Sequence, residues 1–373
     1  DKSNNDPYFS PFSKGFNRTS PIILFSPGLR CYSQDMPGNM IIRKAYAAGF
    51  RSIVVHRRGH TPDQPLKSPR WNLFGDVNDL EQVYWFVKNK LVAAAATNSN
   101  SNNNQTDSSF ANYTTSTHDN DHTTTKDNTP MFLHGISSGT AVTVTALSKW
   151  DKRRVLYPDR PVPVFVASIA VTPGYDISRV MGRERFLFPY HDMLLPGVKD
   201  HFVRKNEHIL RRHDSAAVDK ALAATSLQEF VDATVVFAGY ENTTMYYQDT
   251  NPINDLVDIT TPKLVLNSMD DPCCKIGNLY ERSPQEQHGN KTFAQLIQES
   301  ERAIVAVTRT GSHCPFLCTR GKWLPFTRDP LLSSSNSNKK NRNGGWMLNS
   351  WADQVSIEFY QAALEVYGDR RFL

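Results

Sequence analysis

The stretch Met131-Phe-Leu-His-Gly135-Ile-Ser137-Ser-Gly139-Thr-Ala-Val142 decides the fold, because it joins an apolar strand, a Gly-x-Ser-x-Gly turn and the start of a helix. Such a sharp strand-to-helix turn holds its serine in a strained conformation, and the flanking Gly135 and Gly139 relieve the crowding. The helix N-terminus behind the serine favours developing negative charge. We therefore predict that Ser137 is a nucleophile on a nucleophile elbow; the alternative is a chance turn.

A serine nucleophile needs a base and an orienting acid, which in this kind of fold follow it in the chain order Ser, Asp, His. Two carboxylates, Asp270 and Asp271, follow the apolar run Lys263–Asn267, and His313 follows the run Ala303–Thr308. We predict that Asp271 is the acid and His313 the base. Asp270, one position nearer the strand, is the less favoured acid.

The oxyanion formed by nucleophilic attack needs two backbone N–H donors. The first is predicted to be Ser138, the residue after the nucleophile. The second is predicted to be Leu29, in the loop Ser26-Pro-Gly-Leu-Arg30, where Gly28 lets the backbone turn. An ordinary Pro-Gly turn is the alternative interpretation of this loop.

Apolar runs and helical patterns alternate along the rest of the chain, as in a doubly wound α/β sheet covered on both faces. The segment 174–252 interrupts the alternation with helices, and we interpret it as a helical cap over the carboxyl edge of the sheet. The predicted strands are Pro21–Phe25, Ser52–His56, Met131–His134, Val164–Val171, Lys263–Asn267 and Ala303–Thr308, and the predicted helices are Asp79–Leu91, Thr140–Trp150 and Trp351–Val366.

The chain has 373 residues, of which 39% are apolar, so it can bury a sizeable core. We interpret residues 1–373 as a single α/β domain with two low-complexity inserts, 97–129 and 333–345, that we expect to be disordered. Topology predicts that the first insert is remote from the active site and that the second is on the active-site face. The net charge, 42 − 37 = +5, is too small and dispersed to indicate a nucleic-acid partner. No apolar run approaches the length of a transmembrane helix.

Cysteines and glycosylation sequons together favour a lumenal or extracellular location. None of the cysteine spacings is a zinc pattern, so we predict no metal site. We hypothesise a disulfide between the Cys273/Cys274 pair and Cys314 or Cys318; buried free thiols are the alternative. Five Asn-x-Ser/Thr sequons are candidate N-glycosylation sites, at Asn17, Asn104, Asn112, Asn242 and Asn290.

These residues resemble an α/β-hydrolase-domain family that includes bacterial YheT hydrolases, plant embryogenesis-associated hydrolases, yeast medium-chain ethyl-ester synthases and animal single-pass membrane lipases. The resemblance covers roughly Pro21 to Tyr367 outside the inserts. It departs from the family where Ser26-Pro-Gly28 replaces His-Gly, and where Gly311-Ser-His313 replaces Gly-Gly-His. The similar motifs are His56–Gly59, Leu66–Arg70, Gly75–Leu80, Ser226–Phe230, Phe237–Tyr240 with Tyr246-Tyr247, Asn267–Pro272, and Trp346-Met347 leading into Gln354–Ala363.

The resemblance implies serine hydrolysis of acyl esters of lipids or small alcohols, through an acyl-enzyme and without a metal or organic cofactor. Two alternatives stay open: an acyltransferase that makes esters from acyl-CoA and an alcohol, and a catalytically silent binding protein with the same fold. Many members carry an N-terminal membrane helix, which would lie upstream of Asp1, so we expect a membrane-associated protein. The basic, aromatic segment 186–212 is expected either to contact anionic lipid or to be a solvated helix face.

Overall fold

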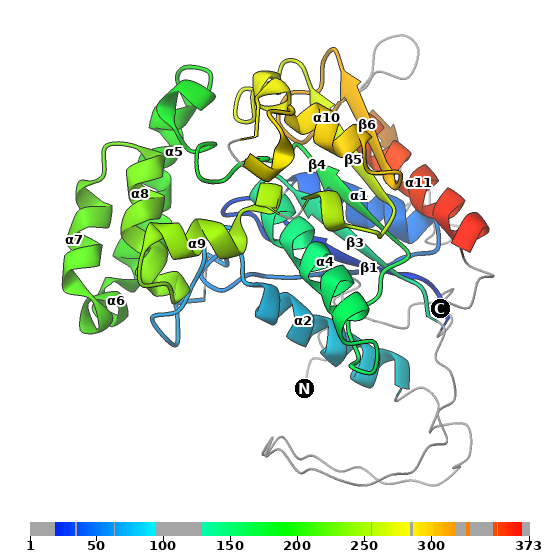
Figure 1. Cartoon of the computed structure of the whole chain (residues 1–373), viewed down its shortest axis with the longest axis horizontal. Helices are drawn as coiled ribbons and strands as arrows, with labels where there is room; N and C mark the ends of the chain where they lie inside the picture. The colour runs from blue at the N-terminus through cyan, green and yellow to red at the C-terminus, as the bar shows by residue number, and fades with distance from the viewer. Residues whose placement is uncertain are drawn as a thin grey trace, which may run out of the picture.

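The computed structural model describes residues 19–33, 36–62, 64–93, 129–254, 256–283, 286–317, 326–328, 346–348 and 350–367. Within these ranges, six strands form a parallel sheet in the order β2-β1-β3-β4-β5-β6 (Figure 1). The chain therefore reverses its direction of winding between β1 and β3. Ligands bind at such a switch point in open α/β sheets, outside the carboxyl ends of the strands.

The strands of this sheet are short; the four central ones, β1, β3, β4 and β5, are buried, whereas the edge strands β2 and β6 are partly exposed. Their bounds are β1 Ile22–Ser26, β2 Arg51–Val54, β3 Met131–Ile136, β4 Ala167–Val171, β5 Lys263–Ser268 and β6 Ala303–Thr308. A separate antiparallel pair consists of β7 Phe326–Arg328 and β8 Trp346–Leu348. The helices are α1 Met36–Ala47, α2 Val77–Phe86, α4 Ser138–Leu156, α5 Tyr190–Val198, α6 Glu207–His213, α7 Ser215–Ala223, α8 Leu227–Thr234, α9 Thr243–Thr250, α10 Phe293–Gln298 and α11 Trp351–Tyr367.

Helices cover both faces of the sheet, so the strands pack in two hydrophobic cores. Helices α2, α4 and α10 bury their apolar residues on one face, and α1 and α11 bury theirs on the other. The predicted doubly wound α/β class is confirmed by this arrangement. Each predicted strand is present, but β4 begins at Ala167, three residues later than predicted.

Several elements of the structure have no counterpart in the prediction. Helices α1 and α10 and the β7–β8 pair were not predicted, and the predicted helix Asp79–Leu91 is an α-helix, Val77–Phe86, that continues as a π-helical turn, Val87–Ala93. The insert 333–345 lies outside the described residues, as does 97–129 except for its last residue. None of the helices in the described ranges is long and apolar enough to cross a membrane.

Helices α5 to α9 form a separate group of helices between β4 and β5 (Figure 1), and they pack around a hydrophobic core that also takes in residues of the body, among them Trp71, Phe74 and Ala141. The two ends of this segment are tied together, since Asn251 Nδ2 donates to Asp176 Oδ1 at 2.7 Å and Ile177 N donates to Asn251 Oδ1 at 3.1 Å. Trp71, from the loop before α2, stacks on Phe202 with ring centroids 4.8 Å apart. This contact links the cap segment to the body.

Candidate active site

The turn between β3 and α4 is shaped by close backbone packing around two glycines. Ser137 sits at its apex with φ 52° and ψ −125°, a strained conformation for a non-glycine residue. A Cβ at Gly139 would lie 2.2 Å from the carbonyl oxygen of Ser26, and a Cβ at Gly135 would lie 2.6 Å from Thr143 Oγ1. Both flanking positions therefore require glycine, and the turn has the geometry of a nucleophile elbow.

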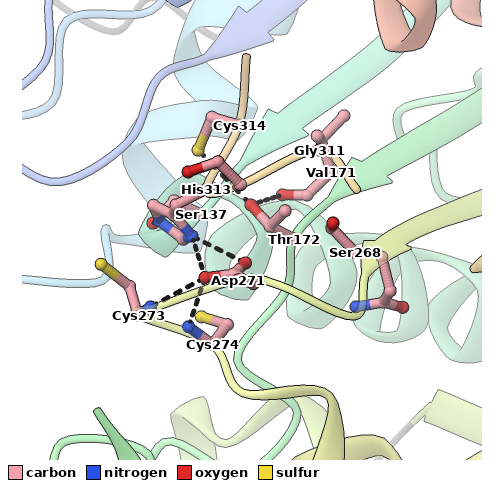
Figure 2. Close-up of polar contacts among 12 residues, drawn as sticks. Ser137, Val171, Thr172, Ser268, Asp271, Cys273, Cys274, Gly311, His313 and Cys314 are labelled. Carbon is pink, nitrogen blue, oxygen red and sulfur yellow. Dashed lines mark hydrogen bonds and ion pairs between the residues drawn. The ribbon is translucent and has the colours of Figure 1, made fainter. Parts of the chain in front are cut away.

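The structure brings together the three residues predicted as nucleophile, base and acid (Figure 2). His313 Nε2 lies 2.8 Å from Ser137 Oγ, and His313 Nδ1 lies 2.9 Å from each carboxylate oxygen of Asp271. Asp271 is buried, whereas the imidazole keeps 19% of its side-chain surface exposed. This relay can remove a proton from the serine hydroxyl and return it to a leaving group.

The two adjacent carboxylates after β5, Asp270 and Asp271, have different hydrogen-bond partners. Asp271 Oδ1 accepts hydrogen bonds from the backbone N–H groups of Cys273 and Cys274, both at 2.8 Å, which fix the carboxylate against the imidazole. Asp270 does not reach the imidazole. Its Oδ1 instead accepts from Gly311 N at 2.9 Å and Ser312 N at 2.8 Å, so it holds the loop that carries the histidine.

Charge and burial shift the pKa values of these groups in opposite directions. Burial disfavours the charged imidazole, but Cys314 and the hydrogen bond to Asp271 outweigh it and hold the pKa of His313 well above its usual value. Burial also disfavours the charged Asp270, but hydrogen bonds from Ser268, Ser312 and Gly311 lower the pKa of this carboxyl. Asp270 is therefore ionised at neutral pH.

The disulfide predicted near the active site is absent from the described residues. Cys273, Cys274 and Cys314 are free thiols, and Cys318 lies outside the described residues. A bridge to Cys318 therefore stays a prediction. Burial raises the pKa of the free Cys273 thiol to about 11. Cys314 Sγ lies 3.4 Å from Thr172 Oγ1.

Three groups of this site could also be considered as metal ligands. Asp271, Cys273 and His313 place ligand-type atoms within 4.8 Å of one another. Both oxygens of Asp271 already accept a hydrogen bond from the imidazole, and the Cys273 thiol is hard to ionise. The donor set therefore favours a hydrogen-bonded relay over a metal centre.

The two predicted oxyanion donors lie beside the nucleophile. Leu29 and Ser138 line the same cavity as Ser137, and a Cβ at Gly28 would lie 3.4 Å from Ser137 Cβ. Within the described residues, neither the Leu29 N–H nor the Ser138 N–H has a protein acceptor. Both donors are therefore available to a ligand.

Sequence reasoning missed one buried residue next to these donors, Arg57. Its Nη2 donates to the carbonyl oxygens of Pro27 and Gly28, both at 2.8 Å, and to Ser138 Oγ at 3.0 Å. The only sequence signal is its place in the motif His56–Gly59, whose Arg-Gly pair carried the family resemblance.

The cavity above Ser137 is apolar and extends under the cap segment. It encloses about 920 Å³, counting its open mouth. Its polar floor consists of the serine, the histidine and the backbone of the loop after β1. The large apolar side chains that line it are Leu29, Phe74, Ile136, Ile177, Val180, Met181, Phe186, Leu194 and Leu227.

Two of the five candidate glycosylation sites lie in the described ranges, and both are exposed. Asn242 caps the N-terminus of α9, where its Oδ1 accepts from Met245 N at 2.9 Å. Asn290 occupies a turn with φ 66°. Asn17, Asn104 and Asn112 lie outside the described residues, and glycosylation stays a prediction at all five sites.

The sheet order, the elbow and the relay together define the architecture. The chain has the α/β-hydrolase fold. No protein-family model matches it. It is similar to the human protein ABHD15, with 23% identity over 300 residues that cover 78% of this chain and 49% of ABHD15, so it spans about half the length of that relative.

Solved structures with related folds align over most of the chain at low identity. A carboxylesterase from Lactobacillus plantarum aligns over 96% of this chain and 88% of its own length, with 15% identity and a TM-score of 0.43. A lipase-esterase related protein from Clostridium acetobutylicum aligns over 80% of this chain and 90% of its own length, with 12% identity and a TM-score of 0.39.

Proposed function

We propose that this protein hydrolyses carboxylic esters through an acyl-enzyme on Ser137. The observation that carries the proposal is the continuous hydrogen-bonded relay from Ser137 Oγ through His313 to Asp271, at the floor of an apolar cavity. A hydroxyl next to a base, with the base oriented by an acid, is the arrangement that activates a serine. The α/β-hydrolase fold, with its elbow between β3 and α4, is compatible with this class of reaction.

Each step of the reaction can be assigned to a group. Ser137 Oγ attacks the ester carbonyl carbon, its proton passes to His313 Nε2, and the carbonyl oxygen becomes an oxyanion facing the N–H groups of Leu29 and Ser138. When the carbon–oxygen bond breaks, the leaving alkoxide takes the proton from Nε2. Water then attacks the acyl-serine, gives a proton to the same nitrogen and releases the acid, and Ser137 regains its proton.

We propose that the acyl group is a medium or long apolar chain, because the cavity is lined by large apolar side chains. A lipid ester such as a monoacylglycerol or a phospholipid fits this chemistry. Acyl transfer from acyl-CoA to an alcohol uses the same acyl-enzyme and differs only in the acceptor. Adding ethanol to the assay and measuring ester product distinguishes the two reactions.

We also propose that the protein belongs with the YheT-type hydrolases. The support is the motif block around α2, where Arg58 Nε lies 2.6 Å from Asp79 Oδ2 and Arg58 Nη2 lies 3.3 Å from Asp76 Oδ2. The two parts of the motif, 18 and 21 residues apart in sequence at these contacts, are therefore joined by ion pairs. These ion pairs give a structural reason why the motifs His56–Gly59 and Gly75–Leu80 occur together in the chain.

We further propose contact with a lipid surface at the mouth of the cavity and, from the resemblance, a membrane-associated lumenal protein. The support is that Phe188 and Met193 are 88% and 69% exposed, beside Phe186 and Leu194, which line the cavity. Large exposed apolar side chains clustered at an entrance are typical of an interaction site. Vesicle co-sedimentation tests this, and binding that is the same for Phe188→Ser/Met193→Ser as for the parent would refute it.

Labelling with a fluorophosphonate probe is the experiment that tests the central proposal. The parent should be labelled, Ser137→Ala should not, and Ser148→Ala, a buried serine further along α4, should be labelled like the parent. A folded parent that resists labelling and hydrolyses no p-nitrophenyl ester of any chain length would overturn the proposal. The catalytically silent binding protein would then be the better interpretation.

A further inference from the structure

Arg57, in the loop after β2, is a buried cation whose hydrogen-bond partners are all neutral. Only 6% of the residue is exposed. Besides its contacts to Pro27, Gly28 and Ser138, its Nη1 donates to the carbonyl oxygen of Leu73 at 3.1 Å. Burial lowers the pKa of this guanidinium to about 10, so it stays charged at neutral pH.

The neighbouring arginine shows what is unusual about this position. Arg58 is partly exposed and pairs with two carboxylates, Asp76 and Asp79. Within the described residues Arg57 pairs with no carboxylate, and its Nε has no partner. A buried charge without a counter-charge is unfavourable for folding, so stability alone does not explain why this side chain is here.

We propose that Arg57 is a positioning residue for the oxyanion hole, an inference that rests on the proposed ester hydrolysis. In a trans peptide the C=O and N–H groups point in opposite directions. Because the Gly28 carbonyl points at the guanidinium, the Leu29 N–H points away from it, toward the side of the loop where Gly28 approaches Ser137.

The same guanidinium also sets the spacing of the two donors. It binds the loop after β1 through two carbonyls and binds the first residue of α4 through Ser138 Oγ. One rigid planar fork therefore joins the segments that carry the Leu29 and Ser138 N–H groups. Its uncompensated positive charge lies behind the site where negative charge develops, which favours the tetrahedral intermediate over the neutral ester.

The test compares Arg57→Met and Arg57→Lys with Lys263→Met. Lys263 is a matched control, because it is also a buried cation with neutral hydrogen-bond partners, Leu256 O and Ser300 Oγ, but it begins β5 at the opposite edge of the sheet. For Arg57→Met we expect kcat to fall about 100-fold, as for loss of an oxyanion donor, with KM nearly unchanged. Arg57→Lys should recover part of kcat, and Lys263→Met should retain the parental kcat.

A trifluoromethyl ketone, which forms an oxyanion on the serine, gives the decisive second readout. Its affinity should fall in parallel with kcat in the Arg57 variants, whereas the affinity for a neutral substrate analogue should not change. A folded Arg57→Met with parental kcat, or with its whole loss in KM, would overturn the inference. If Arg57→Met does not fold, Arg57→Lys decides alone, by the same two measurements.

The outcome for the inference is separable from the outcome for the proposed function. An active parent with unaffected Arg57 variants rejects the inference and leaves ester hydrolysis standing. An inert parent rejects the proposed function, and crystal structures of the parent and Arg57→Lys then test the positioning directly. A displaced Gly28–Leu29 peptide in the variant supports the positioning role, and an unmoved one overturns it.

Discussion

The nucleophile and its base are held in place by different physical means. The turn at Ser137 is fixed by steric packing, because backbone atoms approach Gly139 and Gly135 so closely that a Cβ has no room. The loops that carry Asp271 and His313 are fixed by hydrogen bonds between a side chain and backbone N–H groups. The turn at the nucleophile therefore depends on the absence of a Cβ at two glycines. The loops of the acid and the base depend on carboxylates that accept backbone hydrogen bonds.

This difference determines how each half responds to mutation. A steric constraint fails as soon as one atom is added, since tightly packed backbone cannot move cheaply. A hydrogen-bonded loop loses order gradually, as individual hydrogen bonds are removed. Water can replace the hydrogen bonds that are exposed to solvent. The four predictions below test whether the two halves behave in these two ways.

The largest effect on rate is expected for Asp271→Asn. The amide is nearly isosteric, and its oxygen can still accept from Cys273 N and Cys274 N, so the loop should keep its shape. An amide that donates to His313 Nδ1 stabilises the wrong tautomer, so kcat should fall about 10³- to 10⁴-fold, as in other Ser-His-Asp enzymes. Steady-state kinetics with unchanged thermal unfolding would support this, and a loss below tenfold would contradict the acid role.

The next effect is expected for Gly139→Ala, which tests the steric half of the comparison. The new Cβ would lie 2.2 Å from Ser26 O and 2.4 Å from Pro27 O, so the oxyanion loop must move. A displacement of about 1 Å costs on the order of 100-fold in rate. Overpacking should also lower the free energy of unfolding by about 1–3 kcal/mol.

Chemical denaturation and ester turnover measure the two consequences of Gly139→Ala. Gly277→Ala is a suitable control, because a Cβ there meets no atom within 4 Å. Parental activity and stability in Gly139→Ala would mean that the elbow is less tightly packed than the structure indicates.

The turn at Ser137 and the loops of Asp271 and His313 were predicted from different kinds of sequence signal. A steric requirement leaves a pattern of glycines around a serine, so the elbow could be predicted from the short stretch Met131–Val142. The positions of Asp271 and His313 followed from their places after two apolar runs. The sheet was predictable for the same reason, since buried parallel strands are continuous apolar runs.

Features that depend on three-dimensional contacts between distant segments were not predictable. Arg57 meets segments around residues 27, 73 and 138, and no periodicity in the sequence indicates this. The Cys273/Cys274 pair suggested a disulfide, whereas in the structure its two backbone N–H groups donate hydrogen bonds to Asp271 Oδ1. A backbone hydrogen bond leaves no side-chain signature, so this role of the Cys273 and Cys274 N–H groups could not be predicted from the residue types.

The pH dependence of the rate should show a raised histidine pKa. Asp271 and Cys314 favour the charged imidazole, but only neutral His313 can accept the serine proton. We therefore expect kcat/KM to fall tenfold per pH unit on the acid side of an inflection above pH 6.5. His134 is the internal contrast, because burial lowers its pKa to about 3 and its partner is the hydroxyl of Tyr360. An inflection at or below 6.5 would contradict the stabilisation of the charged imidazole by Cys314 and Asp271.

The smallest effect is expected for Asp270→Asn, and it completes the comparison within one dipeptide. Asp270 is exposed, and an amide oxygen can still accept from Gly311 N and Ser312 N, although a neutral acceptor binds more weakly than a carboxylate. The loop that carries His313 should become more mobile, but the imidazole should keep its tautomer because Asp271 is unchanged. We therefore expect kcat to fall by about two- to tenfold, far less than for Asp271→Asn. Asp270→Ala, which removes the acceptor altogether, should lie between them. Equal losses for Asp270→Asn and Asp271→Asn would mean that the two carboxylates share the imidazole, and the division of labour drawn from their contacts would have to be abandoned.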